Sequence, residues 1–225
     1  MSKIILSTLC LFLSLAMFAQ EEESKEPKNN RHAIGIGIGT GLTFDYSYKI
    51  NEMFYATARY NFFKYGVTDL EQEIDGEIFL VDAAVDFKGF DIAVSIHPFK
   101  SAFKIVAGYG SFQYSNLQVD AVFAESIFIG DVEFTTDDIG IISITSAWNK
   151  QAPYLGIGFG RAVPKNRRLG FGIEIGTYFA GSPDISLQAS GILENTTSQE
   201  DLLQEAFNEL KYLPYLQLRV SYAIF

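Results

Sequence analysis

Cysteine is nearly absent from this sequence of 225 residues, which also holds only two histidines. The one cysteine, Cys10, lies inside an apolar run near the N-terminus, where we interpret it as apolar filler. A chain cut after that run would have no thiol, which excludes disulfides and metal or redox sites built on cysteine. The histidines, His32 and His97, stand far apart and without an acidic cluster, so we predict no metal site and no cofactor.

Positive charge is also scarce, because 17 Lys and Arg stand against 27 Asp and Glu for a net charge of −10. Phosphate backbones are bound by clustered positive charge, so we expect no nucleic acid partner. Apolar runs long enough for a membrane helix are missing too. The run from Ile4 to Phe18 falls short of the roughly 20 residues that a transmembrane helix needs.

The first 20 residues are typical of a secretory signal peptide. Lys3 precedes the apolar run, and the small residues Ala16 and Ala19 come just before a predicted cut after Ala19 or Gln20. An uncleaved N-terminal anchor is the alternative. Residues 21–32 are polar and aperiodic, which predicts a disordered tail. Residues 33–225 then form one domain.

A period-two alternation of side chains, typical of half-buried β-strands, dominates this domain. Residues 34–48 alternate without a break, which predicts one strand with isoleucines and aromatics on one face and mainly glycines on the other. Residues 81–97 show a phase slip near Gly89 that suggests a bulge. Further strands are predicted at 53–65, 103–115, 155–160, 169–179 and 216–224.

Glycine on the second face of these strands decides between two β architectures. A soluble sandwich would fill its water-facing side with Lys, Glu and Thr, whereas bare glycine weakens a strand and leaves its backbone exposed. Glycine suits the interior of a narrow closed barrel whose apolar face meets lipid. We therefore predict an all-β fold, a closed antiparallel transmembrane β-barrel, and keep a soluble barrel or sandwich as the alternative.

Seven strands are visible, and bacterial membrane barrels have an even number. We expect about eight strands and at most ten, with the eighth taken from residues 126–148 or 184–193. Residues 66–80 and 116–150 are predicted as longer connections, and the β-rich pieces 126–134 and 139–148 within the second could pair as a hairpin.

An apolar stripe predicts one short amphipathic helix over residues 197–211, before the last strand, with Thr197 or Ser198 as its cap. This helix could plug the barrel mouth, cap the end of the barrel or lie at the lipid interface.

The domain resembles the small outer-membrane β-barrel proteins of Gram-negative bacteria, the OmpA/OmpX/OmpW-like group of porin-like barrels. The resemblance lies in the first alternating segment AIGIGIGTGLTFDYSY, in APYLGIGFGR and GFGIEIGTYFAGSP, and in the ending YLPYLQLRVSYAIF. It implies a place in the cell outer membrane, reached by secretion through the inner membrane, with outer-membrane lipids as neighbours. It also implies that the last strand, with Tyr222 and the C-terminal Phe225, is the assembly signal read by the barrel-assembly machinery.

The inward face carries the chain's candidate site residues. A polar pore or catalytic lumen is one interpretation, and a self-neutralising network of buried charges is the one we favour. Ser95 and His97 share a face and Asp91 lies near them, which allows a lipid hydrolase, but nothing marks an oxyanion hole. The predicted lumen network consists of Asp45, Arg59, Asp91, His97, Lys104, Glu174 and Arg219.

These observations favour a structural or interaction protein with a narrow lumen and no enzymatic activity. The alternative is a barrel that binds or transports a small apolar or amphipathic molecule. A lipid hydrolase is the third hypothesis.

Overall fold

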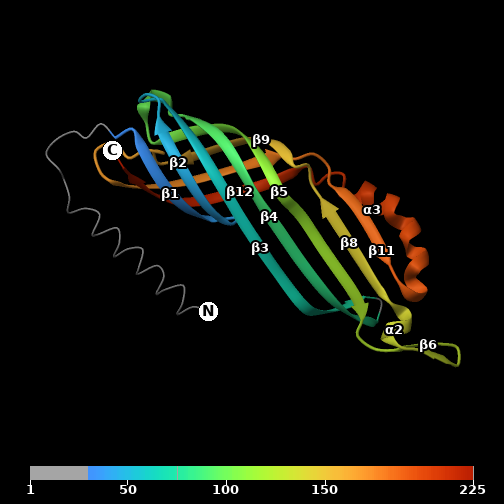
Figure 1. Cartoon of the computed structure of the whole chain (residues 1–225). Helices are drawn as coiled ribbons and strands as arrows, with labels where there is room; N and C mark the ends of the chain where they lie inside the picture. The colour runs from blue at the N-terminus through green and yellow to red at the C-terminus, as the bar shows by residue number, and fades with distance from the viewer. Residues whose placement is uncertain (1–29, 75, 225) are drawn as a thin grey trace, which may run out of the picture.

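Eight antiparallel strands close into a ring in the computed structural model, which describes residues 30–74 and 76–224. The order around the ring is β1-β2-β3-β4-β5-β9-β10-β12, and β12 returns to pair with β1 (Figure 1). The predicted all-β fold and strand number are therefore confirmed. The ring strands are β1 (His32–Gly39), β2 (Leu42–Lys49), β3 (Phe54–Ile74), β4 (Glu77–Ile96), β5 (Phe103–Phe123), β9 (Gln151–Phe159), β10 (Leu169–Phe179) and β12 (Tyr212–Ala223).

The eighth strand comes from the segment that we predicted as a single strand over residues 34–48. This segment is a hairpin that turns at Thr40 and Gly41. Ile38 pairs with Leu42 across the turn, and paired residues lie on the same face of a sheet. The period-two pattern therefore runs through the turn without interruption and hides it. The prediction of the eighth strand from residues 126–148 or 184–193 was wrong.

The two faces of the ring differ as the glycine pattern predicts. Ile34 and Leu218 point outward and are 51% and 54% exposed, whereas Ala33 and Ser47 are buried inside. A Cβ added at Gly35 would overlap the carboxylate of Asp45, so any larger residue there would have to displace the ion pair of Asp45 with Arg219. The interior is too narrow for side chains at every inward position, and glycine gives room for the charged ones.

The two ends of the barrel are built differently. At the end that holds both described chain termini, the connections are short: residues 50–53, the 3-10 helix η1 (Pro98–Lys100) and residues 160–168. We call this the terminal end. At the opposite end, which we call the outer end, the β1–β2 turn lies close to the ring, whereas the β3–β4 hairpin turns only after Ile74. Figure 1 shows that β3, β4 and β5 run far beyond the ring there.

The same sheet extends beyond the ring at the outer end, where β8 and β11 join the long strands, and we call this extension the outer sheet. The connection predicted over residues 66–80 is instead the continuation of the β3–β4 hairpin, and the second half of β5 pairs with β8 (Ile141–Ala147), which pairs with β11 (Asp184–Ala189). Residues 126–134 do not pair with 139–148 as predicted, because they form their own hairpin of β6 (Ile127–Ile129) and β7 (Val132–Phe134), followed by α2 (Thr136–Ile139).

The predicted bulge exists, but its extra residue lies on the partner strand. The register between β4 and β5 shifts at Lys88 and Gly89, which pair with Tyr114 and Phe112. Gln113 of β5 is therefore the extra residue, and the alternation of β5 changes phase at that position.

The predicted helix is shorter than residues 197–211, because α3 covers Glu200–Phe207 and a 3-10 helix, η2 (Gly191–Gln199), precedes it. Thr196, Thr197 and Ser198 each donate a side-chain hydrogen bond to the carbonyl three residues earlier, which accompanies the tighter turns. Neither Thr197 nor Ser198 caps α3, whose N-cap is Gln199.

Helix α3 covers the edge of the outer sheet (Figure 1). The backbone N–H groups of Ile185 and Leu187 on β11 donate to Gln204 and Glu200 of α3, at 2.9 and 2.8 Å. An unpaired strand edge invites association with other chains, and these two side chains occupy part of it. Across residues 30–74 and 76–224, no helix is both long and apolar enough to span a membrane.

Candidate functional site in the barrel lumen

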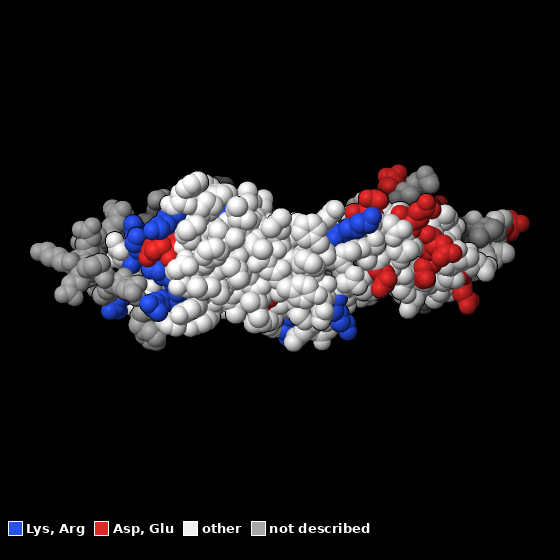
Figure 2. Space-filling model, turned by 90° about the horizontal axis from the view of Figure 1, so that it is seen from above, with Lys and Arg blue, Asp and Glu red and all other residues white. Residues whose placement is uncertain are grey.

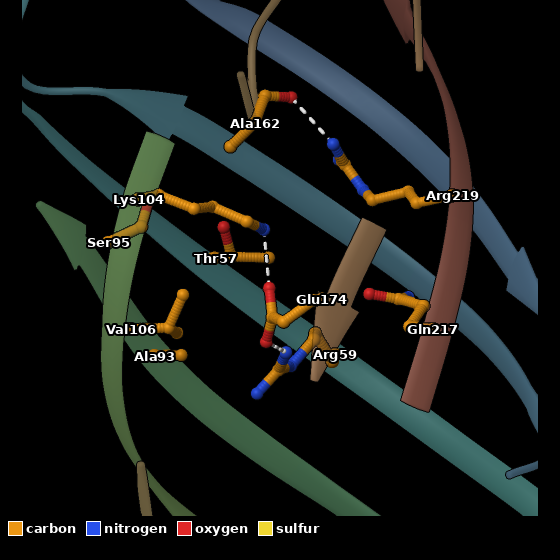
Figure 3. Close-up of a pocket in the computed structure, with 10 residues that line it drawn as sticks. All are labelled: Thr57, Arg59, Ala93, Ser95, Lys104, Val106, Ala162, Glu174, Gln217 and Arg219. Carbon is orange, nitrogen blue, oxygen red and sulfur yellow. Dashed lines mark hydrogen bonds and ion pairs between the residues drawn. The ribbon is translucent and has the colours of Figure 1, made fainter. Parts of the chain in front are cut away.

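A chain of four charged side chains crosses the middle of the lumen, each from a different strand. Arg59 of β3 donates to Asp91 of β4 at 2.7 Å and forms an ion pair with Glu174 of β10. Lys104 of β5 forms an ion pair with the other oxygen of Glu174 (Figure 3). All four side chains are at most 8% exposed, so the strands are tied together by charge-assisted hydrogen bonds inside the ring.

A second ion pair joins β2 to β12 nearer the terminal end. Arg219 donates from Nε to Asp45 at 2.7 Å and makes a further bond to the second carboxylate oxygen. Its other donors reach the hydroxyl of Ser47 at 3.1 Å and the carbonyl of Ala162 at 2.9 Å. The arginine fork thus places the loop of residues 160–168 over the terminal end of the lumen.

Three cations face three carboxylates in these two clusters, namely Arg59, Lys104 and Arg219 against Asp45, Asp91 and Glu174. Their formal charges cancel, which is the condition under which buried charges persist.

Tyrosines close the lumen on the side of the outer end. The guanidinium of Arg59 lies over the rings of Tyr154 and Tyr215, at 4.7 and 5.0 Å from their centres. Tyr154 donates to Glu174 at 2.8 Å and Tyr178 donates to Asp91 at 2.9 Å. The three rings pack against one another, so the charged cluster and the aromatic layer form one unit.

Little space is left between these side chains. The cavity bordered by both clusters measures about 10 Å³, roughly one water molecule. Three polar atoms at its wall have no hydrogen-bond partner within residues 30–74 and 76–224: Oγ of Ser95, Nη2 of Arg59 and Nε2 of Gln217. The side chains of the two clusters thus fill this part of the lumen almost completely.

Ser95 and His97 do not have the arrangement of a hydrolase. The carboxylate of Asp91 is held by Arg59, Asn61 and Tyr178, and it does not orient His97. His97 lies beyond the end of β4 and shares a hydrogen bond with the carbonyl of Ser101 at 3.1 Å through Nδ1. Among the residues that the structure describes, neither its Nε2 nor the hydroxyl of Ser95 has a hydrogen-bond partner, so the pair lacks the bond between nucleophile and base.

His97 is therefore the one member of the predicted network that the structure places outside both clusters. Its ring packs edge-on against Tyr55 at 4.8 Å, and burial lowers its pKa below the usual 6.5. The other six predicted residues are brought together in ion pairs.

Sequence reasoning missed the aromatic part of the site. Tyr154, Tyr178 and Tyr215 point into the lumen. The alternation of inward and outward residues along β9, β10 and β12 was enough to predict this. Most other inward residues of those strands are small. The large size of these three was therefore the signal that could have identified them. Asn61 and Gln217 were likewise missed.

Of the two residues predicted as the assembly signal, Tyr222 points outward on β12, is 40% exposed and accepts a hydrogen bond from Arg168 at 2.9 Å. Phe225 lies outside the described residues, as do the predicted signal peptide and most of the predicted tail.

Charge is distributed unevenly over the outside of the molecule. Figure 2 shows a broad band with very few charged residues on this face, between a mostly basic end and a mostly acidic end. The basic group includes Arg161 and Lys165 at the terminal end, both paired with Glu52. A hydrogen bond from Lys49 lowers the pKa of Glu52. Among the residues described, no cluster of His, Cys, Asp or Glu could hold a metal ion.

Comparison with known proteins supports the fold and no more specific relationship. No family model matches the chain, and no curated protein matches it in sequence. The crystal structure of Acinetobacter baumannii CarO matches with a TM-score of 0.58 at 20% identity, over 87% of this chain and 98% of CarO. CarO2 from the same organism matches with a TM-score of 0.59 at 20% identity, over 88% of this chain and 99% of CarO2. The chain has the same β-barrel fold as these two proteins.

Proposed function

We propose that this chain is an outer-membrane protein of structural or interaction type, in which a sealed barrel anchors the outer sheet at the cell surface. The lumen carries this proposal, because two neutral ion-pair clusters and an aromatic layer fill its middle, and the cavity between the clusters measures about 10 Å³.

The apolar outer surface supports a place in a membrane. On β3 the outward residues from Phe54 to Phe62 are apolar and span 9 positions, and Lys64 ends the band. On β4 the outward residues from Ile96 back to Phe90 are apolar, and Lys88 ends the band at a similar level, opposite Phe62. A tilted membrane strand needs about 9 to 11 residues. We call this band the apolar belt, and propose that outer-membrane lipids surround it.

The orientation follows from the connections. Bacterial barrels have short periplasmic turns and longer extracellular loops. The terminal end would therefore face the periplasm, and the outer sheet with its acidic surface would face the medium. Export by the predicted signal peptide, and folding by the assembly machinery through the last strand, belong to the same proposal.

A sealed lumen gives no path for diffusion of a solute, and the disconnected Ser95 and His97 give no nucleophile with its base. We therefore propose neither a porin nor an enzyme. Purified protein in planar bilayers should give no conductance steps.

A variant with Arg59, Tyr154 and Tyr178 all changed to alanine removes the centre of the seal and should conduct. Its matched control changes Tyr60, which points outward from the same region of β3, to alanine. Steady conductance steps from the unchanged protein, at the level of the triple variant, would contradict the proposal.

A further inference from the structure

The barrel wall has a gap at the outer end, above the β1–β2 turn. The pairing of β2 with β3 ends at Leu42 and Phe62, and β3 continues to Ile74 paired with β4 and with no other strand that the structure describes. On the other side of the turn, the pairing of β1 with β12 ends at Gln217. The first residues of β12, from Tyr212 to Tyr215, pair with β10 and with no other described strand. The edges of β3 and β12 are therefore not paired with each other at this level, although β4 and β10 continue beside them.

An apolar hollow of about 340 Å³ lies in this gap, within the range of about 300 to 1,000 Å³ that is typical of small-molecule pockets. Its walls are side chains from three strands, and its floor is the outer side of the aromatic layer. Phe62 of the apolar belt and the exposed Leu42 beside it on β2 also border the hollow. The hollow therefore opens toward the apolar belt as well as toward the outer end. The apolar wall consists of Phe63, Val85, Phe87, Leu213 and Pro214, and the floor of Thr43, Asn61, Tyr178 and Tyr215.

Two positive charges stand beside the opening. Lys88 pairs directly across from Phe62, and Lys64 occupies the next outward position on β3, across from Asp86, with which it forms no ion pair. In the part of the chain that the structure describes, neither lysine forms an ion pair. An apolar hollow at the edge of the apolar belt, with cations at its rim, fits a molecule with an apolar chain and an anionic head.

We propose that the hollow binds one acyl chain of an anionic lipid of the outer leaflet. The chain would enter over the β1–β2 turn, and the phosphate would lie against Lys64 and Lys88. This inference rests on the membrane location proposed above, and it leaves the sealed lumen below the aromatic layer unchanged.

The proposal can be tested with the protein in nanodiscs of phosphatidylcholine that contain a trace of phosphatidic acid with a diazirine near the end of one acyl chain. After irradiation, peptide mapping should place the label on the wall of the hollow, at Phe63, Val85 or Leu213. Val85→Trp fills the hollow and should lower this labelling at least tenfold. Val94→Trp, on the outward face of the same strand, is the matched control and should leave it unchanged.

Leu213→Trp repeats the test from another strand in case Val85→Trp does not fold, and a shift in gel mobility on boiling shows which variants are folded. The double variant Lys64→Ser with Lys88→Ser should remove the preference for phosphatidic acid over a phosphatidylcholine probe with the same chain. Label confined to the apolar belt, equal labelling in Val85→Trp and Val94→Trp, or equal labelling by both probes in the unchanged protein would overturn the proposal. Because conductance is not measured, failure here is separate from failure of the sealed barrel.

Discussion

Removal of the charge on Glu174 tests the lumen network most sharply. Glu174 is 4% exposed and accepts from Arg59, Lys104 and Tyr154 at once. Glu174→Gln keeps the shape of the side chain but leaves three buried cations against two buried carboxylates. Breaking a buried ion pair from one side costs about 3–5 kcal/mol, so we expect the free energy of unfolding to fall by about that amount.

Urea unfolding in detergent micelles, followed by the mobility shift of the folded barrel, measures this change. Glu52→Gln is the matched control, because Glu52 forms its ion pairs in a turn at the terminal end with 33% exposure. It should cost at most about 1 kcal/mol. The double variant Glu174→Gln with Lys104→Met restores neutrality and should lose less than Glu174→Gln alone. A loss below about 1 kcal/mol for Glu174→Gln would refute the network as a source of stability.

Three further changes probe other parts of the molecule. Gly35→Val should prevent the mobility shift on boiling, because its side chain would overlap an ion pair in the lumen, whereas Ile36→Val on the outward face should keep the shift. The folded-state pKa of His97 lies below 6.5, so the unfolded chain binds this proton first, and stability should fall as the pH drops below about 6.5. His97→Gln should weaken this dependence of the free energy of unfolding on pH. An unchanged dependence would show that His97 is not its source. Glu200→Ala with Gln204→Ala removes the acceptors on the edge of β11 and should speed its hydrogen exchange, measured by mass spectrometry. Exchange at the original rate would mean that α3 does not protect that edge.

The barrel could be predicted from sequence because its cause is local. The parity of a strand residue decides whether it meets the lumen or the outside, and that parity is visible in the alternation of isoleucine with glycine in residues 34–39. The same rule placed Asp45, Arg59, Glu174 and Arg219 inside without any knowledge of their partners.

Features that depend on distant segments could not be predicted in the same way. The β1–β2 turn leaves the alternation intact, so no break in the pattern marks it. The outer sheet depends on β5 changing partner from β9 to β8 along its length, which no local pattern encodes. Which cation pairs with which carboxylate depends on the order of strands around the ring, and that order was fixed only by the fold.

The claim on which the account depends is that the outward isoleucines, leucines and phenylalanines face hydrocarbon. The only cysteine lies in the predicted leader, so single cysteines can be introduced into a mature chain without thiols. Fluorophores at Leu218→Cys and Ile157→Cys, both outward and at least half exposed, should be quenched strongly by lipids with nitroxides on their acyl chains. If these positions faced water, iodide would quench the fluorophores and the nitroxide lipids would not. That result would contradict the account.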